Sequence, residues 1–207
     1  LAARDSLGGL ASNIWPLTRV MTAAFDTVFI ETVGVGQSET GIAHLADTVC
    51  LVLPPAAGDA VQLLKAGIME IPDLYVVNKM DFGPPAEATL EALANFLGDA
   101  DLSGGAEPPL GVSATSGDGI AELDRRLTLR RERLAHEGTL ADRRLASGRR
   151  WAFDRFCNRY GTYGVQRAGG TAGVLRRLEE APNPWSGYSN LEKDFLRLAG
   201  PDGMSNV

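Results

Sequence analysis

Short apolar runs that alternate with segments of helical periodicity are the feature that most constrains the fold of this chain. The runs at residues 49–53, 74–78 and 109–113 are nearly continuous, without the alternation of a strand that has one face in water. Such runs predict strands covered by helices on both faces. Strands that alternate with helices form a parallel sheet, so the front half of the chain is predicted to be α/β. A further strand is expected at residues 27–31.

Helices are expected before and between these strands. The first, at residues 7–24, should end or kink at Pro16, because proline lacks the N–H that a helix interior needs. Another covers residues 59–70, where apolar residues recur at helical spacing and Asp59 can cap the first turn. A third is expected at residues 85–97.

Only helical patterns remain after Gly119. They lie at residues 120–136, 140–160, 171–181 and 189–199. We therefore place a domain boundary near Gly138, with a partial α/β domain at residues 1–138 and an all-helical extension at residues 139–207. The prediction is a parallel sheet flanked by helices and followed by a separate helical part.

The charge of the chain is divided unevenly between these parts. The net charge of the 207 residues is −6, but residues 1–124 hold four basic and 17 acidic residues, whereas residues 125–207 hold 16 and nine. A basic tail can bind nucleic acid. Here the arginines are spaced among Leu, Trp and Phe, which favours an amphipathic helical surface, so we expect no nucleic-acid partner.

Composition also argues against a membrane, a metal cluster and a disulfide framework. No apolar run reaches the roughly 20 residues of a membrane span, and the first residues carry no secretory signal, so a cytoplasmic protein without a membrane partner is expected. Cys50 and Cys157 lack metal-ligand spacing and are expected to be reduced core residues. His44 and His136 are isolated, which gives no support to a zinc site or a Ser/His/Asp triad.

The sequence Asn78-Lys79-Met80-Asp81 directly follows a predicted strand and carries the most specific signal. Asn-Lys-x-Asp in this position is the guanine-recognition motif of GTPases. Asp81 can accept hydrogen bonds from the ring N–H and the exocyclic amine of guanine, Asn78 can bond the far edge of the base, and the stem of Lys79 can cover one face. Adenine lacks both donors, so it would leave a carboxylate unpaired. The alternative is a solvated strand-to-helix turn.

A second motif in the right order favours the nucleotide site over that alternative. Ser113-Ala114-Thr115 closes the next predicted strand and precedes a helix. In GTPases this Ser-Ala turn presents backbone N–H groups to the guanine oxygen and braces the aspartate. By itself the turn could be a helix cap, but together with the first motif it predicts a guanine site.

Glu31 stands at the tip of the predicted strand at residues 27–31, and glycines follow it. In nucleotide-binding sheets an acidic residue at a strand tip handles Mg²⁺ and the attacking water, and a following glycine lets the backbone approach the γ-phosphate. Glu31 and Gly34 are therefore candidate catalytic residues, and Glu31 is a candidate Mg²⁺ ligand. A dinucleotide-binding interpretation of GVGQSE is weak, because Glu39 stands where the third glycine should be.

The segments ETVGVGQSE, AGDAVQLLKAGIMEIPDLYVVNKMD and SATSGDGI together resemble the methylmalonyl-CoA mutase-associated GTPases, the MeaB/ArgK-type metallochaperones. The resemblance is densest from Arg4 to Leu123. It implies a P-loop GTPase-like sheet, with GTP or GDP and Mg²⁺ as cofactors. It also implies GTP hydrolysis coupled to loading or protecting the cobalamin of an acyl-CoA mutase, and a homodimer formed through the helical extension.

The same resemblance assigns roles to residues in the switch regions. Glu31 and Gly34 belong to switch II, and Gln37 lies close enough to help orient water, with a surface glutamine as the alternative. The opening RDSLGGLA, which contains Gly8 and Gly9, resembles switch I.

Residues 55–65 match an extra switch loop of the family. Asp59 and Lys65 are the candidates for passing the nucleotide state to the mutase. Helix capping is compatible with that role for Asp59, and a solvated helix face is the alternative for Lys65. Ala56 stands where the family commonly has glycine.

The phosphate-cradling loop of the family, GxxxxGK[ST], does not occur in this sequence. The strand before that loop would lie beside the strand that ends at Glu31, so the sheet is expected to lack its N-terminal strand and the P-loop. We expect the complete protein to be a GTPase of which this chain is the C-terminal part, and this chain alone to hydrolyse GTP negligibly. The alternative is a non-hydrolysing adaptor that binds the mutase or a full-length homologue.

Overall fold

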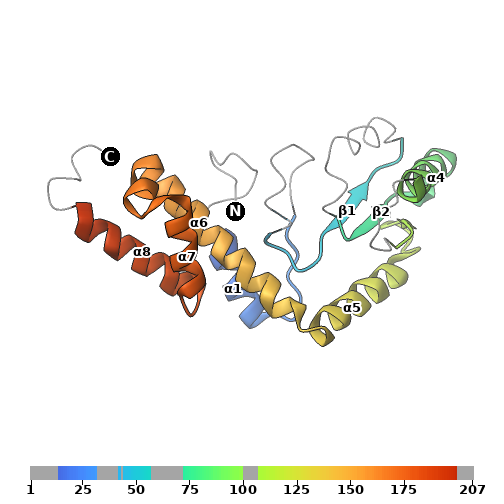
Figure 1. The fold of residues 1–207 in the computed structure, drawn as a ribbon. Coiled ribbons are helices and arrows are strands. Elements are labelled where there is room, and N and C mark those ends of the chain that lie inside the picture. The colour runs from blue at the N-terminus through green and yellow to red at the C-terminus, as the bar shows by residue number, and fades with distance from the viewer. Residues whose placement is uncertain (1–13, 32–41, 43, 57–71, 100–106, 200–207) are drawn as a thin grey trace. The chain divides into compact units, whose positions relative to one another are not determined.

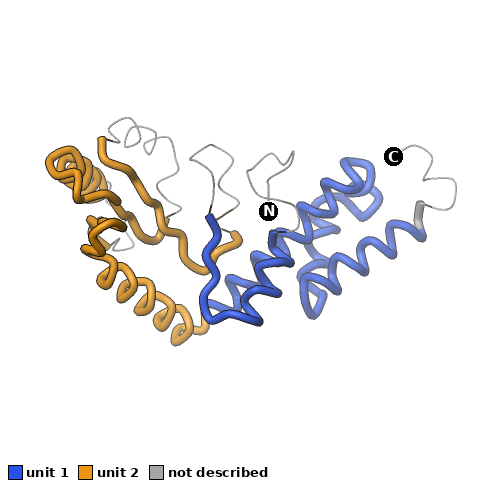
Figure 2. Tube along the Cα trace, turned by 180° about the vertical axis from the view of Figure 1, so that it is seen from behind, with its two compact units in different colours: residues 1–33, 140–207 blue, residues 34–139 orange. Residues whose placement is uncertain are grey.

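The computed structural model describes residues 14–31, 42, 44–56, 72–99 and 107–199, and these fall into two compact units. Unit 1 consists of Leu1–Val33 and Leu140–Val207, and unit 2 of Gly34–Thr139 (Figure 2). The predicted boundary near Gly138 adjoins this division. Residues 1–33, which we placed in the α/β domain, are grouped instead with the helical extension.

Unit 2 is built on a three-stranded parallel sheet (Figure 1). Strands β1 (Cys50–Leu53), β2 (Leu74–Val77) and β3 (Leu110–Gly111) lie in the order β1-β2-β3, with β2 in the middle. All four residues of β2 are buried, as the continuous apolar run LYVV predicts. The predicted α/β class, a parallel sheet with helices followed by an all-helical part, is confirmed.

Two helices and one short turn complete the described part of unit 2. The 3₁₀ turn η1 (Met80–Phe82) and helix α4 (Pro84–Asp99) follow β2, and helix α5 (Ile120–His136) follows β3. Pro84 and Pro85 open α4, where the missing N–H groups need no partner.

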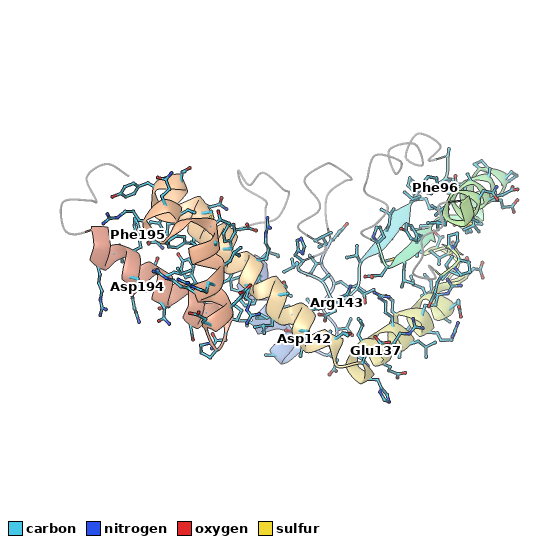
Figure 3. All side chains as sticks on the ribbon, viewed as in Figure 1. Phe96, Glu137, Asp142, Arg143, Asp194 and Phe195 are labelled. Atoms are coloured by element: carbon cyan, nitrogen blue, oxygen red, sulfur yellow. The ribbon has the colours of Figure 1, made fainter. Side chains whose placement is uncertain are left out.

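The core of unit 2 lies between the sheet and α4. Its buried members are Leu53, Tyr75, Val77 and Leu93, and Phe96 (labelled in Figure 3) packs partly buried against them. The starts of the strands are tied together by Asp73. Its carboxylate accepts a hydrogen bond from the N–H of Val49 at 2.8 Å and forms an ion pair with Arg130 of α5.

The structure corrects the predicted strand at residues 27–31. These residues form no strand, and the Phe29 side chain is 85% exposed. A strand is stable only where its N–H and C=O groups pair with a neighbour. Within the described part of the chain this segment has no such pairing, so its apolar composition is not sufficient.

Pro16 has a different effect from the one predicted. Helix α1 (Ile14–Ala24) begins two residues before it, so Pro16 lies in the first turn. The N–H groups of a first turn have no partner within the helix, and proline therefore neither ends nor kinks α1. The earlier part of this predicted helix, and the whole of the one at residues 59–70, lie outside the described residues.

Unit 1 combines α1 with three helices of the extension. These are α6 (Thr139–Arg167), α7 (Gly170–Glu180) and α8 (Pro184–Ala199) (Figure 1). The predicted helix end at residue 160 coincides with a kink, because Gly161 has non-helical backbone angles, but α6 continues beyond it to Arg167. Helix α8 begins earlier than predicted, at Pro184, a residue that is favoured at the first helical position.

Aromatic rings hold these helices together. The rings of Trp15 and Trp151 stack with centroids 4.8 Å apart, and Trp185 meets Trp151 edge-on at 4.9 Å. Nearer the end of α8, Phe195 (Figure 3) lies 6.2 Å from the buried Phe156. These contacts explain why Trp and Phe recur at helical spacing in the extension.

Neither cysteine forms a disulfide. Cys50 in β1 and Cys157 in α6 are free and half-buried. Burial raises the pKa of the Cys50 thiol to about 11, so it is protonated at neutral pH. None of the helices in the described ranges is long and apolar enough to cross a membrane.

Candidate functional site

The candidate site lies where β2 and β3 end, because the chain makes a polar turn after each of these strands. The N–H of Asn78 donates to the carbonyl of Leu53 at 2.9 Å and so continues the sheet by one residue. The Asn78 Oδ1 atom accepts hydrogen bonds from the N–H of Lys79 at 2.7 Å and of Ala114 at 3.2 Å. The amide of Asn78 thus joins the two predicted motifs.

Contacts of Met80 and Ser113 fix the orientation of the Asp81 carboxylate. The N–H of Met80 donates to the carbonyl of Val112 at 3.0 Å, and the Met80 side chain packs against the core. The hydroxyl of Ser113, which is fully buried, donates to Asp81 Oδ1 at 2.6 Å. Within the described ranges the second carboxylate oxygen, Oδ2, accepts no hydrogen bond, so it can receive donors from a ligand.

The loop after β3 is closed by hydrogen bonds to Ser113. The N–H of Gly117 donates to its carbonyl at 2.9 Å, and the N–H of Ser116 donates to its hydroxyl at 3.1 Å. Ala114 and Thr115 are exposed at the tip. In the part of the chain that the structure describes, the N–H of Thr115 has no acceptor. The loop that carries this exposed donor is joined to the Asp81 carboxylate through Ser113.

Gly119 sets the position of this loop, and sequence reasoning did not single it out. Its φ is 73°, and a Cβ atom there would lie 2.4 Å from the carbonyl oxygen of Gly111. Only glycine allows α5 to begin so close to β3. The available signal was the second glycine of SATSGDGI, which marks a turn but not the close approach.

An ion-pair cluster in the first turns of α5 holds the entry to β3. Arg126 donates to the carbonyl of Pro108 at 2.6 Å and to Glu122 at 2.8 Å. Hydrogen bonds from Arg125 and Arg126 lower the pKa of Glu122 to about 2. Glu122 therefore remains ionised at neutral pH and orients both arginines.

The other predicted site residues lie in unit 1 or outside the described residues. Glu31 is exposed at the end of a described segment of unit 1. The remaining candidates lie outside the described residues; they are Gly8, Gly9, Gly34, Gln37, Asp59 and Lys65. No group of three or more His, Cys, Asp or Glu within the described ranges could hold a metal ion, so the role of Glu31 toward Mg²⁺ stays a prediction.

Ala56 adopts the backbone conformation that glycine favours, with φ 58°. A Cβ atom in this region costs about 1–2 kcal/mol, and the greater chain entropy of glycine offsets roughly 0.5–1 kcal/mol of that. We expect Ala56→Gly to raise the free energy of unfolding by up to about 1 kcal/mol in urea titrations followed by circular dichroism. The matched change on an exposed helical position, Ala88→Gly, should lower it by about 1 kcal/mol. Equal losses in the two variants would contradict the left-handed geometry of Ala56.

Comparison with known proteins identifies the family. Residues 1–162 match a family model described as "Methylmalonyl Co-A mutase-associated GTPase MeaB". The chain belongs to the MeaB family. The matched region contains all residues of the site and ends within α6, just after Gly161.

Individual relatives of the MeaB chain carry names of the same kind. A protein of Pyrococcus abyssi named "Putative GTPase" is 42% identical over 149 residues, which is 70% of this chain and 46% of the relative. The mitochondrial methylmalonic aciduria type A homolog of Caenorhabditis elegans is 48% identical over 86 residues, 41% of this chain and 22% of the relative. The chain thus spans less than half the length of these relatives.

Proposed function

We propose that this chain is the guanine-recognising part of a GTP-hydrolysing chaperone that assists the loading or protection of cobalamin in an acyl-CoA mutase, such as methylmalonyl-CoA mutase. The observation that carries the proposal is the hydrogen bond of 2.6 Å from the buried Ser113 hydroxyl to Asp81 Oδ1. This bond fixes the orientation of the carboxylate, in which Oδ1 still has a lone pair and Oδ2 has no donor within the described ranges. The two oxygens can therefore accept two neighbouring donors, which is the pattern that guanine offers.

The geometry supports discrimination between bases. An adenine base would bring an unprotonated ring nitrogen toward Asp81, where the carboxylate would lose its water without gaining a donor. The N–H of Thr115 would meet the guanine carbonyl oxygen on the next edge of the base, and the Asn78 amide can meet the far edge. Asn78 is held by the N–H groups of Lys79 and Ala114, and Asp81 by the Ser113 hydroxyl, before a ligand arrives, so little ordering is needed on binding.

The hydrolytic half of the proposal rests on other residues. Glu31 would supply a carboxylate to a magnesium ion that is otherwise held by nucleotide phosphates and water, as Mg²⁺ commonly is in nucleotide sites. Gly34 would allow the backbone to approach the γ-phosphate, and Gln37 would help to orient water. Because GxxxxGK[ST] does not occur in this sequence, we propose hydrolysis for the complete protein and expect this chain alone to release negligible phosphate from GTP.

The proposal extends to partners and compartment. Family membership supports a cobalamin-dependent acyl-CoA mutase as partner, with Asp59 and Lys65 in the coupling segment. We further propose that the chain acts as a cytoplasmic homodimer through its helical extension, in which Trp and Phe side chains are frequent.

The test is binding of the chain to purified apo-methylmalonyl-CoA mutase by surface plasmon resonance, with and without saturating GDP. A nucleotide-dependent chaperone should bind the mutase with an affinity that GDP changes about 5- to 150-fold, the usual range of coupling between two sites. Asp81→Asn serves as the control, because it should bind the mutase but lose the response to GDP. Absence of mutase binding at any nucleotide concentration would rule out the partner.

A further inference from the structure

The turn after β2 places an exposed aromatic ring beside the lysine of the candidate guanine site. Phe82 is 60% exposed, although it is a large apolar side chain. Its N–H donates to the carbonyl of Lys79 at 3.0 Å, and this bond folds the turn back on itself. As a result the Lys79 Nζ atom lies over the Phe82 ring, 5.7 Å from its centroid.

The backbone of Lys79 is unusual as well. Its φ and ψ are 61° and 43°, in the left-handed region that residues with a Cβ rarely adopt. Two hydrogen bonds hold this conformation. The N–H of Lys79 donates to Asn78 Oδ1, and the carbonyl of Lys79 accepts from the N–H of Phe82. Such conformations persist where the surrounding contacts over-determine them, and they cluster at binding sites. Lys79 and Phe82 flank Asp81 in the chain, whereas Met80 between them turns toward the core.

We propose that Phe82 is a positioning residue for Lys79. The contact between the ammonium group and the ring face holds the lysine extended, so that its methylene stem forms a fixed apolar surface against one face of the purine base. This inference rests on the guanine site proposed above and adds a residue to it. A free lysine side chain loses much rotamer freedom when it is ordered by a ligand, and a lysine already held by Phe82 loses less, which strengthens binding.

The test is titration of the ¹⁵N-labelled chain with GDP, followed through the amide signals of residues 113–116. Phe82→Leu keeps an apolar side chain but removes the ring, and should weaken GDP binding about two- to fivefold, the value of an exposed cation–π contact. Phe82→Tyr keeps the ring and should stay within twofold of the parent. In a Lys79→Met background, Phe82→Leu should have no further effect, because the cation that the ring attracts is gone.

A second readout needs no nucleotide. Protons above an aromatic ring resonate upfield, so the ε-methylene protons of Lys79 should move downfield in Phe82→Leu and remain in place in Phe82→Tyr. The inference is overturned if these signals do not move, or if Phe82→Leu weakens GDP binding equally in the parent and Lys79→Met backgrounds. Failure of the parent chain to bind GDP at all would instead overturn the proposed function, and this inference with it.

Discussion

Replacing Asp81 with asparagine is expected to move the base preference of the chain from guanine to xanthine. Ser113 donates to Oδ1 of Asp81, and it can donate in the same way to the amide oxygen of an asparagine. The amide nitrogen would then take the place of Oδ2 and face the ligand as a donor. This N–H donor matches the C2 carbonyl oxygen of xanthine, which is an acceptor. In guanine it would face the C2 amine, which is also a donor.

The expected size of this change follows from the bonds involved. Hydrogen bonds to a charged group contribute about 1.5–3 kcal/mol each, so the ratio of the dissociation constants for GDP and XDP should shift about 100-fold or more. The measurement is amide-signal titration of parent and variant with each nucleotide. Asp124→Asn, an exposed change of the same kind on α5, is the control and should leave both constants unchanged. If Asp81→Asn still bound GDP more tightly than XDP, Asp81 would not be the residue that recognises the base.

Replacing Gly119 with alanine is expected to destabilise unit 2 and to displace the loop after β3. The new Cβ would lie 2.4 Å from the Gly111 carbonyl oxygen and 3.2 Å from Val112 Cα, at a backbone φ of 73°. The backbone strain costs about 1–2 kcal/mol, and the overlap adds about 1–3 kcal/mol. We therefore expect a loss of roughly 3 kcal/mol in the free energy of unfolding of unit 2.

Gly138→Ala provides the matched control for this prediction. Gly138 has a φ of 70°, but a Cβ there would meet nothing within 4 Å, so it should show the backbone cost alone. Because all three tryptophans lie in unit 1, the readout for unit 2 is hydrogen exchange of the Val76 and Val77 amides in the buried strand. Tryptophan fluorescence reports the unfolding of unit 1, and its midpoint in urea should equal that of the parent chain. Equal losses in the two alanine variants would contradict the close approach of α5 to β3.

The sequence predicted elements whose stability is decided by nearby residues. Helix α5 has the predicted limits, Ile120 and His136, because apolar and charged residues alternate with helical period and Gly119 precedes them. Strand β2 was predictable because its four apolar residues need cover on both faces. The two motifs could be placed together because the carboxyl ends of neighbouring parallel strands meet at one edge of a sheet.

Features that depend on distant parts of the chain were not predictable in this way. The segment at residues 27–31 has the composition of a strand. A strand forms only where a neighbouring strand pairs with its N–H and C=O groups, and the local sequence does not reveal whether such a neighbour is present. The close approach of Gly119 to Gly111 requires the packing of α5 on β3. The contact between Lys79 and Phe82 requires a left-handed residue, which no hydrophobic period reveals.

The most direct test of the central claim is whether the parent chain prefers guanine to adenine at the ends of β2 and β3. The measurement is titration of the ¹⁵N-labelled chain with GDP and, separately, with ADP. We predict that GDP shifts the amide signals of Ala114 and Thr115 at concentrations about 100-fold below those that ADP requires, because only guanine offers donors to Asp81. Equal concentrations for the two nucleotides, or shifts that leave residues 78–81 and 113–116 unaffected, would contradict the assignment of this site.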